Sequence, residues 1–399
     1  MSRTGWLQET KLMRFEEAYT SWQEKRLTQE EAASLLGVCE RSFRRYINRF
    51  EEDGLQGLLD KRMAQVSSYK APVDEVLRLE ALYRERYEGW NLKHFHERYQ
   101  RAHGGTRSYT WVKNALQEKG VVKKGKRKGT YRKRRERAPL PGMLIHQDGS
   151  THQWVPGVYW DLIITMDDAD GCVYSGFFVE EEGTLSSLRG VSETITRHGL
   201  FSSFYSDRGS HYWHTPEAGG KVDKTRLTQF GRAMQQLGIQ MIPSYSPQAR
   251  GRSERLFKTL QGRLPQELAL HGIVDMELAN QFLEKEFLPA FNRQFQTDAR
   301  EPGTAFVPLL DARVKDILCL QTERQVGKDS CVAYQGIQLQ LPPDPCSGHY
   351  IRSKVRVHEY PDGSLAVFHG PRKLADYDAD GSRVTVDKPK SKSKARKVA

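Results

Sequence analysis

Cysteine is scarce in this sequence, and long apolar runs are missing from it. The 399 residues include five cysteines, which are widely scattered and form no CxxC pair. We therefore expect neither a disulfide framework nor a cysteine-based zinc site. No apolar run approaches the ~20 residues that a membrane-spanning helix needs, and the first residues lack the apolar core of a signal peptide. These absences favour a protein of the reducing cytoplasm.

Acidic residues are outnumbered, and the excess positive charge is concentrated in two segments. The chain has 62 Lys and Arg against 50 Asp and Glu, a net charge of +12. Residues 123–137 carry a net charge of +9 and residues 388–399 carry +6, which leaves −3 for the rest of the chain. Basic blocks of this kind make sequence-independent phosphate contacts. Nucleic-acid binding is therefore favoured over segments that only improve solubility.

Residues 1–62 predict a helix-turn-helix domain. Thr28, with Glu31 three residues later, has the pattern of a capping box, and Phe43 and Ile47 recur at helical spacing. The recognition helix of such a domain lies in the major groove of DNA. Its outer face here carries four arginines that we expect to contact DNA: Arg41, Arg44, Arg45 and Arg49. A three-helix bundle with an arginine-rich surface is the alternative.

Residues 70–121 predict a second helix-turn-helix-like domain, although the two segments are not a sequence repeat. Three helical faces can be recognised in it, and Lys113 on the third is expected to reach DNA. His94, His96 and His103 have no cysteines nearby. We therefore interpret them as core or surface histidines rather than zinc ligands.

A basic linker, 122–138, follows the second domain. Its cations are expected to contact DNA phosphates, chiefly through Lys124, Arg127, Arg132, Arg134 and Arg135.

After the linker the hydrophobic period changes from helical to alternating, and residues 139–300 predict an α/β core. Strands are expected within 142–150, 159–181 and 201–210, and helices at 184–197, 227–237 and 251–270. The run DDADG at 167–171 predicts the turn of a hairpin. From residue 311 short strands return, so 311–386 predicts a small β-barrel, followed by a basic disordered tail at 387–399.

Three acids stand out in the core by their context. Asp148 and Asp207 each close an apolar run that predicts a strand, and Glu254 lies one turn into a predicted helix. Carboxylates at the ends of neighbouring strands can converge with one from a helix, and Mg²⁺ takes such oxygen ligands. On spacing alone, a shared metal site and separate turn or surface roles are equally supported. Asp167 and Asp168 lie in the expected turn, which makes them poor candidates for metal ligands.

Three segments of the core resemble the catalytic blocks of DDE transposases and retroviral-type integrases. They are IHQDG at 145–149, YSDRGSH at 205–211 and YSPQARGRSERLFK at 245–258. The order of the domains is similar too, with an RNase H-like core between helix-turn-helix domains and a barrel. The chain looks most like bacterial insertion-sequence transposases of the ISNCY group. Unlike retroviral integrases, it lacks an amino-terminal His/Cys zinc module, and 46 residues separate Asp207 from Glu254.

The resemblance implies a function and a set of roles. Asp148, Asp207 and Glu254 would be the catalytic metal ligands, holding two Mg²⁺ or Mn²⁺ ions. Arg252 and Lys258 beside Glu254 would contact DNA, while His211 would lie near the scissile phosphate or serve as a structural loop residue. A bacterial, nucleoid-associated transposase is implied, which binds transposon ends and target DNA and self-associates. The alternatives are a non-catalytic DNA-binding regulator and an RNase H-like nuclease.

Overall fold

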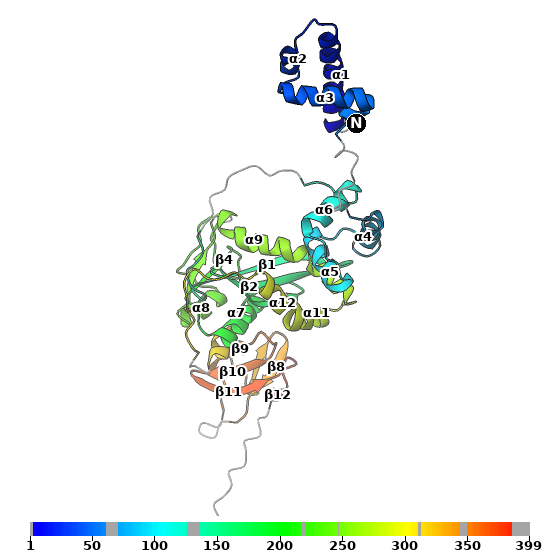
Figure 1. Cartoon of the computed structure of the whole chain (residues 1–399). Helices are drawn as coiled ribbons and strands as arrows, with labels where there is room; N and C mark the ends of the chain where they lie inside the picture. Colours follow the sequence, from blue (N-terminus) through cyan, green and yellow to red (C-terminus); the bar gives the residue numbers. More distant parts are fainter. Residues whose placement is uncertain are drawn as a thin grey trace, which may run out of the picture. The chain divides into compact units, whose positions relative to one another are not determined.

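The computed structural model describes residues 3–60, 71–125, 136–217, 220–245, 247–309, 313–343 and 349–384. They divide into two compact units, whose helices and strands are labelled in Figure 1. One unit comprises residues up to 86 together with 110–123, and the other comprises 87–109 together with the described residues from 124 onward. Some predicted features lie outside the described residues, namely Arg127, Arg132, Arg134, Arg135 and the tail at 387–399.

The first unit begins with three helices and a 3-10 turn. They are α1 (Arg3–Gln23), α2 (Gln29–Leu35), α3 (Glu40–Asp53) and η1 (Gly54–Leu58). The predicted capping box at the start of α2 is confirmed. Thr28 Oγ1 accepts from the Glu31 N–H at 3.2 Å, and the Glu31 carboxylate accepts from the Thr28 N–H at 2.7 Å. Phe15, Phe43 and Ile47 are buried at the centre of the bundle, so the expected three-helix arrangement is present.

Three further helices follow where the sequence predicts them. They are α4 (Val73–Arg86), α5 (Leu92–His103) and α6 (Tyr109–Glu118). Helix α5 belongs to the second unit. Its His94 and His96 are buried, where they contact the Glu267 carboxylate at 2.6 Å and the Arg107 carbonyl at 2.9 Å. That 70–121 forms a domain of its own stays a prediction.

The core of the second unit is a mixed five-stranded sheet with the order β3-β2-β1-β4-β5. Its strands are β1 (Leu144–Val155), β2 (Val158–Asp167), β3 (Val173–Val179), β4 (Ser203–Ser206) and β5 (Gln240–Pro243). The first three strands pair antiparallel, whereas β4 runs parallel to β1 and β5 runs parallel to β4. The turn between β2 and β3 is the one that the DDADG run predicts.

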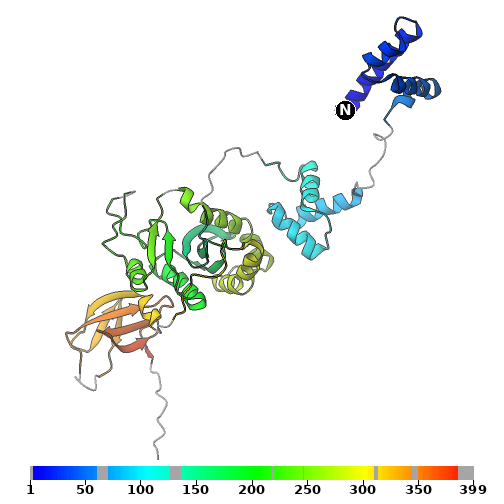
Figure 2. The same cartoon turned by 60° about the vertical axis from the view of Figure 1, so that its left-hand side comes forward.

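Helices cover both faces of this sheet (Figure 2). On one face α7 (Thr184–His198) and α8 (Gln229–Gln236) bury Ile145 and Phe204. Leu162 and Ile164 are buried on the other face, under α9 (Pro247–Gln261), α10 (Leu264–Leu270), α11 (Met276–Phe282), the π-helical turn η3 (Leu283–Phe287) and α12 (Leu288–Phe295). In the ranges described, no helix has the length and apolarity that crossing a membrane requires.

Three features of the core differ from the sequence-based expectation. Strand β1 continues seven residues beyond Asp148, because β2 pairs with it as far as Val155. Asp148 therefore lies within β1 and does not end it. The helix predicted for 251–270 is interrupted at Gly262 and Arg263, between α9 and α10. Strand β5 was not predicted.

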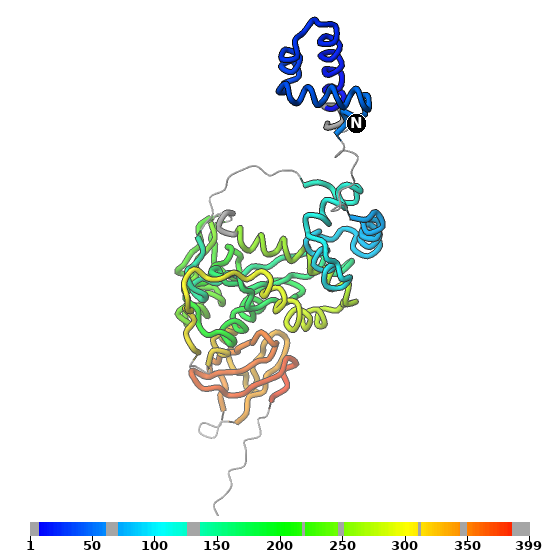
Figure 3. Tube along the Cα trace, viewed as in Figure 1, coloured from blue at the N-terminus to red at the C-terminus, as the bar shows by residue number. Residues whose placement is uncertain are grey.

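The C-terminal part, drawn in orange to red in the trace of Figure 3, contains short strands, as expected. They are β6 (Leu320–Gln325), β7 (Cys331–Tyr334), β8 (Ile337–Gln340), β9 (Lys354–Glu359), β10 (Leu365–His369), β11 (Arg372–Tyr377) and β12 (Arg383–Val384), preceded by α13 (Val314–Ile317). One sheet has the order β12-β11-β10-β9-β6, and β7 and β8 form a separate hairpin. Val332 and Leu339 of the hairpin share an apolar core with Val357 and Val367 of the sheet. No pairing between described strands closes this sheet, so the predicted barrel is unconfirmed.

Candidate active site

Two of the three predicted acids follow matching positions on neighbouring parallel strands. The β1–β4 register pairs His146 with Tyr205, and the two rings lie 4.8 Å apart. Asp148 and Asp207 each follow two residues later. Side chains two residues apart along a strand share a face, so Asp148, which lies within β1, is on the face of His146. Asp207 directly follows Ser206, the last residue of β4. The two positions therefore correspond across the β1–β4 pair, two residues past its last matched residues.

The negative charges of these two aspartates act on the pKa of a buried tyrosine, Tyr212. The Tyr212 hydroxyl donates to Gln147 Oε1 at 2.9 Å, in the interior next to β1. Burial raises the pKa of Tyr212 far above its usual range, and the negative charges of Glu182, Asp207 and Asp148 raise it further. Three carboxylates thus lie within electrostatic range of one buried hydroxyl. Glu182 was not among the predicted site residues.

The loop after β4 is shaped around the Asp207 carboxylate. Asp207 Oδ1 accepts from the Gly209 N–H at 2.9 Å. A Cβ added to Gly209 would lie 3.0 Å from that oxygen and 2.9 Å from Cε1 of His211. Gly209 therefore leaves the space in which the carboxylate and the imidazole approach each other. The ring of His211 lies 3.9 Å from that of Tyr212, measured between centroids.

The third predicted acid, Glu254, is on the exposed side of α9. The buried side of this helix packs under the sheet through Ser253, Leu256, Phe257 and Leu260. Gln261 Nε2 also donates to Ser150 Oγ on β1, at 3.0 Å. Glu254 and Lys258, one helical turn apart, both face solvent. Among the described residues, no group of three or more His, Cys, Asp or Glu side chains is arranged to hold a metal ion. The role of Glu254 as third ligand stays a prediction.

Arg252, which we predicted to contact DNA, has a partner inside the protein. Its guanidinium forms an ion pair with the carboxylate of Asp168, which is almost fully buried and also contacts His146 Nε2 at 2.8 Å. Burial raises the pKa of Asp168, but the hydrogen bonds from His146 and Arg252 outweigh burial and hold that pKa well below its usual range. These contacts link α9 to the turn after β2.

The carboxylate of Asp167, the neighbouring acid of that turn, also has its hydrogen-bond partners inside the protein. Its carboxylate accepts from the N–H groups of Gly142 and Ala169, both at 2.7 Å, and from the Tyr174 hydroxyl at 3.2 Å. Burial raises the pKa of Asp167 to about 6 despite these hydrogen bonds. Asp167 and Asp168 therefore both anchor the turn between β2 and β3.

The remaining predicted DNA contacts are cations of α3, α6, α9 and the linker. The four arginines of α3 are exposed, and Arg44 forms an ion pair with Glu40 at 3.6 Å. Lys124 and Lys258 are exposed, whereas Lys113 is half-buried. Their contacts with DNA stay predictions.

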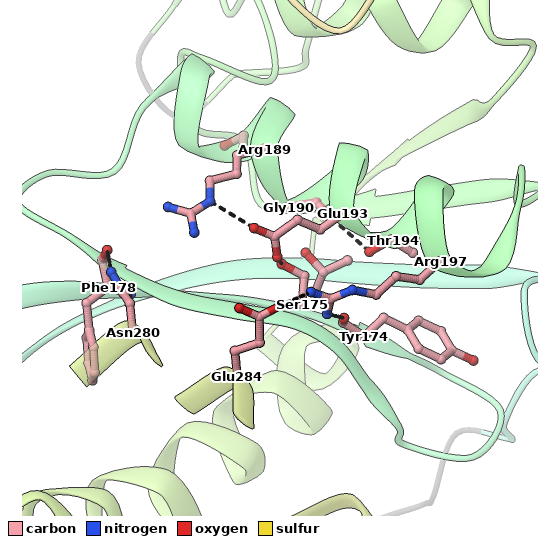
Figure 4. Close-up of polar contacts among 12 residues, drawn as sticks. Tyr174, Ser175, Phe178, Arg189, Gly190, Glu193, Thr194, Arg197, Asn280 and Glu284 are labelled. Atoms are coloured by element: carbon pink, nitrogen blue, oxygen red, sulfur yellow. Dashed lines mark hydrogen bonds and ion pairs between the residues drawn. The ribbon is translucent and has the colours of Figure 1, made fainter. Parts of the chain in front are cut away.

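A polar cavity of about 460 Å³ lies elsewhere in the core, between β3, α7 and α11. Figure 4 shows its ion pairs, Arg189 with Glu193 along α7 and Arg197 with Glu284 across to η3. On the edge strand β3, the Phe178 N–H donates to Oδ1 of Asn280 at 2.6 Å. Nδ2 of Asn280 donates in turn to the Phe178 carbonyl at 3.1 Å. None of the predicted acids lines this cavity, so it is separate from the Asp148–Asp207 site.

Similarity to known proteins extends over most of the chain. A family model described as winged helix-turn helix matches residues 22–65. The protein y4bF of Sinorhizobium fredii (strain NBRC 101917 / NGR234), assigned as a transposase, is 30% identical over 348 residues, which are 86% of this chain and 75% of that protein. The transposase for insertion sequence IS1202 of Streptococcus pneumoniae is 34% identical over 161 residues, 40% of this chain and 34% of that protein.

Solved structures give weaker likenesses. A chain of the simian T-cell lymphotropic virus intasome, determined in complex with the PP2A regulatory subunit B56 gamma, has a TM-score of 0.35 and 15% identity, covering 71% of this chain and 93% of that one. The HTLV-2 integrase catalytic core domain, determined with magnesium, has a TM-score of 0.28 and 15% identity, covering 36% of this chain and 83% of that one.

Proposed function

The chain belongs to the transposases, and on that premise we propose that it cuts and joins DNA with a metal-dependent active site of the DDE type. The observation that carries this proposal is the register of the parallel strands β1 and β4, because Asp148 and Asp207 each come two residues after its last matched pair, His146 and Tyr205. Two carboxylates so placed are suited to hold divalent cations at the scissile phosphate. Glu254 of α9 would be the third ligand. Among transposases, the run HQDGS at 146–150 and the segment TERQVGKDSCVAYQGIQLQLP at 322–342 favour the ISNCY group.

The donor set at this site suits a hard divalent cation. Asp148 and Asp207 offer carboxylate oxygens, the ligands that Mg²⁺ and Mn²⁺ take, and both charges act on the same buried hydroxyl of Tyr212. Gly149 and Gly209 lack side chains at points where carboxylate or imidazole atoms lie. Two ions held by Asp148, Asp207 and Glu254 would activate the attacking oxygen and stabilise the leaving oxygen of an in-line displacement.

The proposed reaction has two steps of the same type. In the first, water attacks the phosphodiester at each transposon end, the bond to the 3′ oxygen breaks, and a 3′-OH is freed. In the second, that 3′-OH attacks a phosphodiester of target DNA, a new bond forms, and the target's own 3′ oxygen leaves. Neither step forms a covalent bond between protein and DNA. Lys258, one turn after Glu254 on the exposed side of α9, would hold a DNA phosphate beside the acids.

Other parts of the chain would select and hold DNA. The exposed arginines of α3 would read the terminal repeats, a second helix-turn-helix-like domain at 70–121 would add contacts, and the linker at 122–138 would bind phosphates. Residues 139–300 would form the RNase H-like core and residues 311–386 a small barrel. Since two ends must be joined together, a dimer or a larger assembly is expected.

A nicking and strand-transfer assay tests the proposal. Labelled end DNA is incubated with the full chain in Mg²⁺ or Mn²⁺, and wild type is compared with Asp148→Asn, Asp207→Asn and Glu254→Gln. We expect metal-dependent formation and joining of 3′-OH ends by wild type, lost in all three variants. Glu277→Gln, an exposed acid on α11, is the matched control and should retain activity.

The other results separate the rival functions. End binding without cleavage by any of the proteins would instead identify a DNA-binding regulator. Cleavage without preference for end sequence would identify a structure-directed nuclease. If Glu254→Gln cleaves and joins as wild type does, Glu254 is not the third ligand.

A further inference from the structure

Glu182 lies in the loop between β3 and α7, yet its carboxylate reaches the residue that follows Asp148. A Cβ added to Gly149 would collide with Oε2 of Glu182 and lie 2.6 Å from its Cδ. The Glu182 N–H donates to Asp161 Oδ2 at 2.7 Å, which fixes the start of the side chain over β2. The carboxylate therefore occupies the space that the absent side chain of Gly149 leaves open.

On its other side, Glu182 contacts His211. Oε1 of Glu182 lies 3.4 Å from Nε2 of His211, which is buried and has no hydrogen-bond partner within the described residues. The Cε1 and Nδ1 atoms of the same imidazole lie against Gly209, beside Oδ1 of Asp207. The histidine is thus placed between the carboxylates of Glu182 and Asp207.

We propose that Glu182 is a positioning residue of the active site, which holds the His211 imidazole in place beside Asp207. The proposal rests on the proposed DNA-joining function and adds a residue to that site. In the complex with DNA, Glu182 accepts a hydrogen bond from Nε2 of His211, and the fixed ring in turn confines the Asp207 carboxylate. Residues that orient a metal ligand in this way can change activity about 10- to 100-fold.

This role predicts which substitutions are tolerated. Glu182→Gln keeps an oxygen that accepts from Nε2, so joining should stay within about threefold of wild type. Glu182→Ala removes the acceptor, and the rate of joining at saturating DNA should fall about 10- to 100-fold with end-binding affinity unchanged. Glu181→Ala is the matched control, because Glu181 precedes Glu182 and is exposed. It should behave as wild type does.

Gly149 provides a second, independent test. Its Cβ would meet only the end of the flexible Glu182 side chain, so Gly149→Ala should fold but displace that carboxylate. The rate of joining should then fall about as far as in Glu182→Ala. If both act through the same displacement, the double variant should be no slower than either single variant. Additive losses would show that Gly149→Ala acts on Asp148 instead.

Two further readouts separate positioning from other roles. Binding of Mn²⁺ to the DNA-free protein, measured by electron paramagnetic resonance, should be the same for wild type, Glu182→Gln and Glu182→Ala. In the complex with end DNA, nitrogen chemical shifts of ¹⁵N-labelled histidine should place the His211 proton on Nε2 in wild type and in Glu182→Gln, and should change in Glu182→Ala.

The outcomes are distinguishable from failure of the proposed function. Absence of joining by wild type would refute the function itself. Active wild type with unimpaired Glu182→Ala would overturn only the inference about Glu182. Equal damage in Glu182→Gln and Glu182→Ala, with weaker Mn²⁺ binding in both, would also overturn it and would make Glu182 a metal ligand.

Discussion

Arg263 and Glu97 form a two-point ion pair, in which the guanidinium donates to both carboxylate oxygens at 2.7 and 3.1 Å. Both side chains are largely buried, with exposed fractions of 9% and 14%. Gln294 of α12 donates to the same carboxylate at 2.7 Å. Arg263 lies between α9 and α10, and Glu97 belongs to α5. The pair therefore fixes α5 to the junction at the end of the helix that carries Glu254.

Replacing Arg263 with alanine should destabilise the second unit by about 3–5 kcal/mol, because it leaves the Glu97 carboxylate buried without its counter-ion. Urea unfolding, followed by tryptophan fluorescence, measures the loss. Arg78→Ala is the control, since Arg78 pairs with Asp74 on the surface, where both side chains are more than 70% exposed. A surface pair contributes at most about 1 kcal/mol. Equal small losses in both variants would contradict a structural role for the Arg263–Glu97 pair.

The features that could be predicted from sequence depend on residues close together in the chain. The capping box of Thr28 and Glu31 is complete within four residues, and the structure contains it as expected. The DDADG run specifies its turn for the same reason. Asp148 and Asp207 could be singled out because each follows an apolar run, and their neighbours on β1 and β4 do pair in register.

The features that could not be predicted depend on partners far apart in the chain. Strand β1 continues past Asp148 because β2 pairs along its whole length, which the residues of β1 alone do not indicate. Glu182 comes 33 residues after Gly149, and only the folded sheet brings them together. The single local signal was the glycine directly after Asp148, where a side chain would have filled the space that the Glu182 carboxylate takes.

Asp167 should make stability depend on pH. Burial raises the pKa of its folded state to about 6, above the ordinary 3.8. Below the unfolded-state pKa the carboxyl is neutral in both states and has no cost, whereas above pH 6 the folded protein must bury a charge. Stability contributed by this group should therefore be lost as the pH rises from about 4 to 6, by up to about 3 kcal/mol.

The measurement compares wild type with Asp167→Asn, which has no carboxyl to titrate. Urea unfolding at several pH values should show the stability of wild type relative to the variant falling between pH 4 and 7. Subtracting the variant removes the contribution of other titrating groups. A difference that stays constant with pH would mean that Asp167 titrates alike in both states.

Arg252 and Lys258 lie on the same helix, but they should respond differently to substitution. Arg252→Ala leaves the buried Asp168 carboxylate without its guanidinium partner, so thermal stability should fall markedly. Lys258→Ala removes an exposed cation, so stability should stay within about 0.5 kcal/mol of wild type. Loss of one phosphate contact should also lower the slope of log affinity against log salt by about 0.9. Lower DNA affinity in Arg252→Ala without loss of stability would show that Arg252 contacts DNA and does not stabilise the fold through Asp168.

The arginines of α3 can be tested for base reading as opposed to phosphate contact. Arg45 is exposed on this helix, and Lys11, an equally exposed cation on α1, is its matched control. If Arg45 reads a base edge, Arg45→Ala should weaken binding to end DNA by about 1–3 kcal/mol, with a smaller loss for unrelated DNA. Fluorescence anisotropy at fixed salt measures both affinities. An equal loss for both DNAs would make Arg45 a phosphate contact, and no loss for either would show that Arg45 does not contact the DNA.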